Sequence, residues 1–253
     1  MNNLAIGRFP SQSYSVSEAV NTLCTNLSFS GENVKKIMIT SCHAAEGKSY
    51  LSMNIMRTMA KFGKNVVLVD ADLRRSVITK EYALQFANAE RKCGLAHYLA
   101  GKAEEGDVIY STNIDGAYMV PVGREVSNPL PLLNSQRFDR LLNELARQSD
   151  YVLVDAPPVG TVIDGAQIAK SCDGTLIVVN YNTVRRQELI DVQNQLEQTG
   201  CPILGTVLNM VEYDSYLSKK YSYKYYYSHY DRYEKGSKTG RQERQRGDKA
   251  RKT

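Results

Sequence analysis

The stretch "TSCHAAEGKSYLS" (residues 40–52) is a loop of small residues that ends in a lysine and a hydroxyl. An apolar run precedes it, and the residues after "GKS" have helical periodicity, so the loop is predicted to join a strand to a helix. In that setting, backbone N–H groups and the positive end of the helix can surround phosphates. Lys48 would neutralise phosphate oxygens and the Ser49 hydroxyl would reach Mg²⁺. The complete pattern has glycine where this chain has Cys42, so a chance match of "GKS" is the alternative.

Three carboxylates follow two other apolar runs. "VVLVDADLRR" places Asp70 and Asp72 at the end of one run, and "YVLVDAPP" places Asp155 at the end of another. Each of the three alone would be explained as a helix cap. Beside a phosphate-binding loop, however, they can supply the one or two carboxylates that a nucleotide's Mg²⁺ needs. Arg74 would contact either phosphate oxygens or a neighbouring acid.

The elements that must position these residues alternate along the chain. Apolar runs rich in Val and Ile predict strands over residues 34–40, 65–70, 151–155, 174–180 and 202–209. Helical patterns lie between them, over residues 48–62, 135–148, 163–171 and 185–199. Weaker patterns predict strands at 107–112 and 117–123 and a short helix at 94–101. Unbroken apolar strands are typical of a parallel sheet buried on both faces. The prediction is a doubly wound, mainly parallel α/β fold that binds ligands at the carboxyl ends of its strands.

The length and composition favour a globular protein with appendages. The chain has 253 residues, of which 42% are hydrophobic. We expect an N-terminal extension and helix over residues 1–33, a nucleotide-binding domain over 34–211 and a tail over 212–253. The segment 15–29 is predicted to be an amphipathic helix that begins with a capping box of Ser15 and Glu18. We find neither a signal peptide nor an apolar run of roughly 18 residues, and the five cysteines have no paired spacing, so we expect a reduced, cytoplasmic protein.

Together these motifs resemble the bacterial tyrosine kinases of capsular and exopolysaccharide synthesis, a family with nucleotide-binding loops of the MinD and ParA type. The pattern of acid, any residue, acid, any residue, arginine in "VDADLR" is the specific element, and "GLAHYLAG", "SNPLPLLNS" and "GTVLN" extend the likeness over nearly the whole chain. The resemblance implies a separate kinase subunit. Such a subunit docks on a membrane adaptor of the polysaccharide co-polymerase type, at the inner face of the plasma membrane. No specific nucleic acid partner is implied.

The resemblance also implies roles for individual residues, with ATP and Mg²⁺ as the bound groups. Asp72 and Asp155, with Ser49, correspond to the metal-positioning residues, and Asp70 to the base that accepts the phenol proton. Since a tyrosine hydroxyl has a pKa of about 10, a placed base would help its attack. Asn209 matches a position that touches adenine, and its alternative role is that of an ordinary turn residue. The loop residues that correspond to the nucleotide-binding set are Ala45, Glu46, Gly47, Lys48, Ser49 and Tyr50.

The segment 213–233 holds nine of the seventeen tyrosines, without an apolar periodicity that would bury them. We expect these tyrosines to be the substrate, phosphorylated in trans by a second copy of the chain. They are Tyr213, Tyr216, Tyr221, Tyr223, Tyr225, Tyr226, Tyr227, Tyr230 and Tyr233. The alternative is an aromatic and basic linker that stacks on nucleic acid. Residues 234–253 carry eight Lys/Arg and three Asp/Glu, as in a disordered, solubilising tail or one that binds anionic partners.

Two other functions stay open. A partitioning-type ATPase would carry a signature lysine where this chain has His43. A catalytically weak regulatory homologue is the second, because Ala45 stands where the kinases usually have glycine. Relatives also form rings through a helix with a glutamate and two arginines at three-residue spacing. Here the matching residues are Glu18, Asn21 and Cys24, which predicts weaker self-association.

Overall fold

The computed structural model describes residues 2–88 and 92–211, so the predicted tyrosine cluster and basic tail lie outside the described residues. The nine strands are β1 (Asn2–Ile6), β2 (Lys36–Ser41), β3 (Val66–Asp70), β4 (Leu84–Phe86), β5 (Tyr110–Ser111), β6 (Ala117–Val120), β7 (Tyr151–Asp155), β8 (Gly174–Asn180) and β9 (Ile203–Asn209). The helices are α1 (Tyr14–Ser28), α2 (Lys48–Lys61), α3 (Ile78–Glu81), α4 (Leu95–Leu99), α5 (Glu105–Val108), α6 (Leu130–Leu133), α7 (Gln136–Gln148), α8 (Asp164–Ala169) and α9 (Arg186–Glu197).

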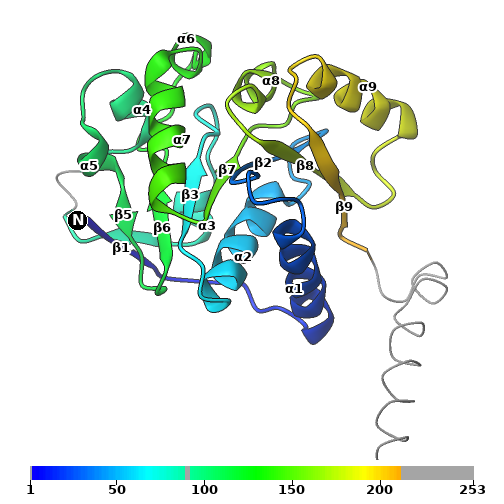
Figure 1. The fold of residues 1–253 in the computed structure, drawn as a ribbon, viewed down its shortest axis with the longest axis horizontal. Helices are drawn as coiled ribbons and strands as arrows, with labels where there is room; N and C mark the ends of the chain where they lie inside the picture. Colours follow the sequence, from blue (N-terminus) through cyan, green and yellow to red (C-terminus); the bar gives the residue numbers. More distant parts are fainter. Residues whose placement is uncertain (1, 89–91, 212–253) are drawn as a thin grey trace, which may run out of the picture. The chain divides into compact units, whose positions relative to one another are not determined.

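The strands form one sheet in the order β4-β1-β5-β6-β3-β7-β2-β8-β9. Six neighbouring pairs are parallel, and β1 with β4 and β5 with β6 are antiparallel. In the centre, β7 lies between β3 and β2, so the ends of the three strands that carry the predicted site are adjacent (Figure 1). The predicted doubly wound, mainly parallel α/β fold is confirmed.

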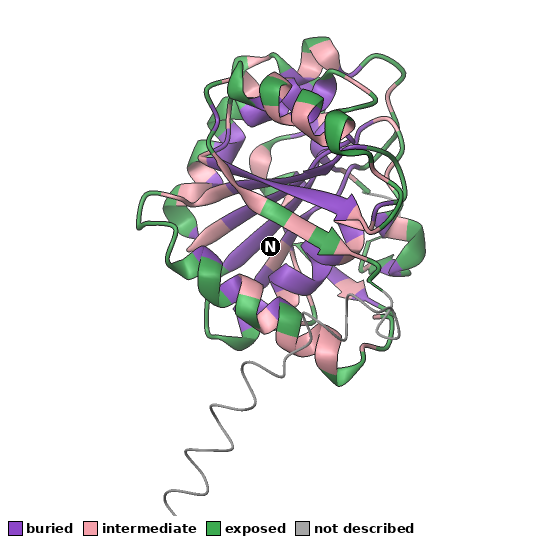
Figure 2. Cartoon of the chain, turned by 90° about the vertical axis from the view of Figure 1, so that its right-hand side faces the viewer, coloured by how far each residue is buried: buried purple, intermediate pink, exposed green. Residues whose placement is uncertain are grey.

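The sheet separates two hydrophobic cores because successive residues of a strand point to opposite faces. In β2, Ile37 and Ile39 pack with α1, α2 and α3, whereas Met38 packs on the opposite face with α4, α7, α8 and α9. The central strands alternate in the same way and lie buried between two helical layers (Figure 2). This arrangement explains why their sequences are apolar at every position rather than at every second one.

The N-terminal region belongs to the sheet. β1 pairs with β4 and β5, and the backbone N–H groups of Gly7 and Arg8 donate to the carbonyl of Tyr82. The described residues up to Met210 belong to one compact unit, and the predicted boundary at residue 33 stays a prediction. The sequence did not predict β1, β4 or α3.

The predicted capping box at the start of α1 is wrong. The helix begins at Tyr14, and its N-cap is Ser13, whose hydroxyl accepts a hydrogen bond from the Val16 N–H at 3.3 Å. The Glu18 side chain instead accepts from the amide of Asn21 at 3.0 Å. Ser15 and Glu18 matched the spacing, but Ser13 has the extended backbone that an N-cap requires.

No helix among residues 2–88 and 92–211 combines the length and the apolarity that crossing a membrane requires.

Candidate active site

The loop between β2 and α2 turns sharply at Gly47, where α2 begins. Gly47 has φ of 85°, a left-handed conformation that glycine adopts without strain. A Cβ atom there would lie 2.1 Å from the side-chain nitrogen of Asn209, so the position has no room for a larger residue. Since the first four N–H groups of a helix lack intrahelical acceptors, the start of α2 can bind an anion.

Glu46 and Asn209 brace this loop from two sides. The Glu46 side chain is only 3% exposed, and its carboxylate accepts from the backbone N–H groups of His43 at 2.9 Å and Asn180 at 3.3 Å. Asn209, at the end of β9, donates its side-chain amide to the Glu46 carbonyl at 2.9 Å. These contacts hold the loop against the ends of β8 and β9.

Ala45 and Tyr50 complete the predicted set of loop residues. Ala45 has φ of 63°, the left-handed region in which an alanine is strained, so glycine would suit this position better. The Tyr50 side chain is directed toward the N-terminal segment, where its hydroxyl accepts from the Gln12 amide at 3.2 Å.

Asp155 connects the end of β7 to the first turns of α2. One of its oxygens accepts from the Ser49 hydroxyl at 2.6 Å, and the other from the Ser52 hydroxyl at 3.0 Å. Burial raises the pKa of Asp155, although the charge of Lys48 and these two hydrogen bonds oppose the rise. The predicted pair of Ser49 and Asp155 is therefore in direct contact.

Lys48 and Asp72 form a second pair, with 3.5 Å between the ammonium nitrogen and a carboxylate oxygen. The Lys48 side chain is 11% exposed and that of Asp72 is 8% exposed. Burial would lower the pKa of Lys48, but the charges of Asp155, Asp72 and Asp70 outweigh burial and raise it. Lys48 is therefore protonated among three acids, and its positive charge is available to bind a more highly charged anion such as a polyphosphate.

Asp70 is fully buried beside these groups. Its Cα is the register partner of Asp155 in the adjacent strand. Burial, and then the charge of Asp155, raise the pKa of Asp70 to about 8. The Ser76 hydroxyl donates to one carboxylate oxygen, whereas the other oxygen is buried without a hydrogen-bond partner among the described residues. A buried oxygen without a partner is costly unless a ligand or substrate supplies one.

Arg74 contacts a neighbouring acid, the second of its two predicted alternatives. Its guanidinium forms two hydrogen bonds with Asp164, at the start of α8, and donates to the Ser127 carbonyl at 3.1 Å. The hydrogen bonds raise the pKa of Arg74. The residue therefore ties the acidic loop after β3 to α8 and to the segment before α6.

The residues present fit a magnesium ion that is shared with a nucleotide. Carboxylate and hydroxyl oxygens of Asp70, Asp72, Asp155 and Ser49 are the ligand type that Mg²⁺ prefers. Within the described part of the chain, no three acidic, histidine or cysteine side chains are placed to enclose an ion on their own. Protein sites for Mg²⁺ commonly combine one or two carboxylates with phosphate oxygens and water, which suits this arrangement.

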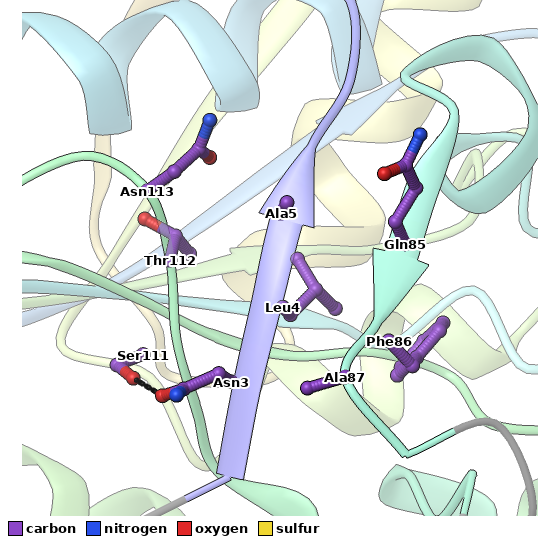
Figure 3. A pocket seen from close by; sticks show the side chains of 9 residues that line it. All are labelled: Asn3, Leu4, Ala5, Gln85, Phe86, Ala87, Ser111, Thr112 and Asn113. Carbon is purple, nitrogen blue, oxygen red and sulfur yellow. Dashed lines mark hydrogen bonds between the residues drawn. The ribbon is translucent and has the colours of Figure 1, made fainter.

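A pocket of about 350 Å³ lies near the edge of the sheet where β4, β1 and β5 are neighbours (Figure 3). β1, β4, β5 and the residues after them line it with uncharged side chains, including Asn3, Gln85 and Asn113. Both groups of the Asn113 amide already bond the backbone of Ile6. Neither the loop between β2 and α2 nor the acidic residues of the candidate active site line this pocket, so the two sites are separate.

The comparisons with known proteins agree with this geometry. A family model described as an AAA domain matches residues 34–201. The tyrosine-protein kinase CpsD of Streptococcus pneumoniae is 36% identical over 195 residues, which cover 77% of this chain and 84% of that protein. The chain belongs to the bacterial tyrosine-protein kinases.

Solved structures support the assignment of this kinase to the same family. The kinase domain of the Escherichia coli tyrosine kinase ETK superposes with a TM-score of 0.74 and 32% identity, and the match covers 79% of this chain and 78% of that domain. The septum site-determining protein MinD of Pyrococcus horikoshii matches with a TM-score of 0.58 and 22% identity, over 69% of this chain and 70% of that protein. The MinD likeness establishes the shared fold of nucleotide-binding ATPases.

The sequence predicted most of the residues that the fold brings together. Lys48, Ser49 and the three acids converge, and Asn209 reaches the loop from β9. Three residues of the site were not predicted. Ser52, Ser76 and Asp164 form hydrogen bonds with Asp155, Asp70 and Arg74, in that order. Ser52 lies three residues after Ser49 on a helix, so helical spacing was a usable signal for it. Ser76 and Asp164 carried no such signal.

Proposed function

We propose that this kinase transfers the γ-phosphate of ATP, with Mg²⁺, to the tyrosines of residues 213–233 in a second copy of the chain. The observation that carries the proposal is the convergence of Lys48, Ser49 and three acids around the start of α2. Lys48 would stabilise the negative phosphates, while Ser49, Asp72 and Asp155 would position the metal. Among the described residues, one buried oxygen of Asp70 has no hydrogen-bond partner, and Asp70 would accept the phenol proton.

The short distance along the chain supports transfer in trans. Tyr213 comes only four residues after Asn209, which itself contacts the nucleotide loop. Four extended residues span at most about 14 Å, so the first tyrosine of the cluster has too little chain to bend freely back into the same site, whereas transfer in trans can reach every tyrosine. Several phosphates, each of about −1.5 to −2 charge, would then reverse the sign of a basic segment and repel one another.

The proposal includes a place in polysaccharide synthesis. By its resemblance to the separate kinase subunits of capsule and exopolysaccharide systems, this kinase would dock on a membrane adaptor of the co-polymerase type and regulate synthesis or export. Coexpression with such an adaptor would move the kinase into the membrane fraction, and expression alone would not.

Two experiments test the transfer. Lys48→Met should remove nearly all phosphotyrosine while leaving the fold intact, because Lys48 acts on phosphate charge. Equal labelling of the mutant and the wild type would refute the loop assignment. In the second experiment, Asp70→Asn protein is mixed with a chain that ends at Val211 and still hydrolyses ATP. An unlabelled tail on the Asp70→Asn protein would refute transfer in trans.

One observation favours a second candidate, a kinase of low activity. Ala45 has a left-handed backbone, which favours glycine, and its Cβ atom would crowd a phosphate that approaches the loop backbone. The partitioning-type ATPase gains no such support, since His43 stands at the signature position and its ring nitrogen lies 3.5 Å from a carboxylate oxygen of Glu188 in α9. Measured rates of phosphotyrosine formation and of ATP hydrolysis would distinguish an active kinase from either.

A further inference from the structure

The eight tyrosines of the described residues differ sharply in their access to solvent. Tyr14 is 69% exposed. Of the other seven, Tyr82, Tyr98 and Tyr110 are buried, and Tyr50, Tyr118, Tyr151 and Tyr181 are half-buried. In the part of the chain that the structure describes, Tyr14 is thus the tyrosine that a second protein can reach most readily.

The other phenols would have to leave packed positions before they could enter an active site. The Tyr110 hydroxyl donates to the Cys93 carbonyl at 2.9 Å, and the Tyr82 ring packs edge-on against Phe9. The Arg137 guanidinium lies over the ring of Tyr98. Tyr118 and Tyr151 lie within strands of the sheet. Presenting any of these side chains would break core contacts.

Tyr14 occupies a place that opens at low cost. It is the first residue of α1, and residues 7–13 before it form neither helix nor strand. A capping hydrogen bond, from the Val16 N–H to the Ser13 hydroxyl, is among the contacts of this helix end. Because helix ends fray locally without global unfolding, the first turn of α1 can open and present the phenol.

We propose that Tyr14 is a further phosphate acceptor of this kinase, modified by a second copy of the chain. The proposal rests on the proposed function. The Tyr14 oxygen attacks the γ-phosphorus of ATP, and the bond from that phosphorus to the oxygen bridging the β- and γ-phosphates breaks. ADP leaves, and the phenol proton passes to a carboxylate of the site, for which Asp70 is placed.

The product suits a folded α1. A phosphate adds about −1.5 to −2 charge, and negative charge is favourable near the positive end of a helix. No acidic residue occupies the first turn of α1. One turn later, Glu18 lies four residues from Tyr14 on the same side of the helix, and the weak repulsion between these like charges is offset by the positive end of the helix. Modification would therefore make this face of α1 more negative without unfolding it.

The test uses the full-length chain with the nine tail tyrosines, from Tyr213 to Tyr233, replaced by Phe. After incubation with Mg-ATP and digestion with trypsin, mass spectrometry examines the peptide over residues 9–35, in which Tyr14 is the single tyrosine. We expect phosphate on this peptide. Adding Tyr14→Phe should remove nearly all remaining phosphotyrosine, whereas adding Tyr118→Phe, a matched change at a half-buried tyrosine, should not.

A tyrosine-containing copolymer serves as the external substrate in the same reactions. If the copolymer is phosphorylated but the peptide over residues 9–35 is not, the Tyr14 site is refuted and the kinase function stands. A phosphotyrosine level that Tyr14→Phe leaves unchanged also refutes it. If neither the copolymer nor the chain is phosphorylated, the proposed function itself fails, and the Tyr14 site with it.

Discussion

Burial determines how Asp70, the proposed acceptor of the phenol proton, titrates. Its pKa is raised to about 8, first by burial and then by the charge of Asp155, so the carboxyl is mostly protonated at neutral pH without ligands. A base must be ionised, and positive charge near the site would lower this pKa toward the working pH. The same environment that holds the proton in the free protein can thus release it when the site is filled.

Replacing Asp70 by Asn should therefore change stability and activity in opposite directions. The raised pKa means that folded protein keeps a proton that unfolded protein loses at a pH near 4. The contribution of Asp70 to the unfolding free energy of the wild type is thus fully present below about pH 4 and is lost as pH rises toward 8. Asp70→Asn removes this loss, so its advantage in urea unfolding should grow between these values. Phosphotyrosine formation should fall by about 10²–10⁴-fold.

Asp115→Asn is a matched control for the stability measurement, because Asp115 is exposed. Its unfolding free energy should follow the wild type across the same pH range. An Asp70→Asn protein whose stability relative to wild type does not depend on pH would contradict the raised pKa.

Ala45 is a site of backbone strain. Since left-handed backbone costs an ordinary L-residue about 1–2 kcal/mol, glycine should relieve it. Glycine also makes the unfolded chain more flexible, which costs about 0.4–1 kcal/mol. Ala45→Gly should therefore be as stable as wild type or more stable. Ala44→Gly, at a neighbour without positive φ, should lose about 0.4–1 kcal/mol in urea unfolding. Equal losses in both variants would show that Ala45 is not strained.

At the scale of elements, Arg74 joins three segments that the chain order separates. It connects the loop after β3 to α8 and to the backbone at Ser127. Asp164 has a side chain only 1% exposed, whereas that of Arg74 is 34% exposed. Removing the arginine would leave a buried carboxylate without its cation.

We expect Arg74→Ala to lower the unfolding free energy by about 3 kcal/mol, near the lower end for a broken buried pair because Arg74 is partly exposed. Activity should fall as well, since the loop that carries Asp72 would loosen. The neighbouring exposed Arg75 offers a control, and Arg75→Ala should change stability by less than about 0.5 kcal/mol. Similar effects of the two changes in urea unfolding would contradict a special role for Arg74.

The sequence predicted elements well where a local pattern reflected burial. The central strands were visible because both of their faces are covered, and α2 and α7 differ from their predicted ranges by one residue. β4 was missed because it has only three residues, and β1 because it begins with two exposed asparagines; the pairing of these two strands joins segments that are distant in the chain. The capping box failed for a related reason, since Ser15 had a glutamate three residues later, but Ser13 has the extended backbone of the N-cap. The convergence of Lys48, Ser49 and the three acids was predictable because strand ends meet at one edge of a parallel sheet, whereas Asp164 reaches Arg74 only through the fold.

At the scale of the whole molecule, α1 differs from the helix through which related kinases form rings. Asn21 stands at the position of the first arginine, and its amide donates to Glu18 of the same helix. Cys24 stands at the position of the second, where it is 0% exposed, with its sulfur 4.0 Å from the Ile55 carbonyl oxygen. Neither side chain offers a cation to a neighbouring subunit, and an arginine at position 24 would have to leave the core.

We therefore predict that the unphosphorylated protein at micromolar concentration forms no stable closed ring in light scattering. An exposed ion pair contributes only about 0–1 kcal/mol, but a ring repeats each head-to-tail contact at every interface, so a missing contact weakens all of them. Asn21→Arg should shift the equilibrium toward larger assemblies, because it gives Glu18 of a neighbour a cation to bind. Asn21→Gln, which changes length without charge, should leave the distribution unchanged. A stable ring of the wild-type chain would contradict this prediction, because contacts other than the arginines would then have to hold it together.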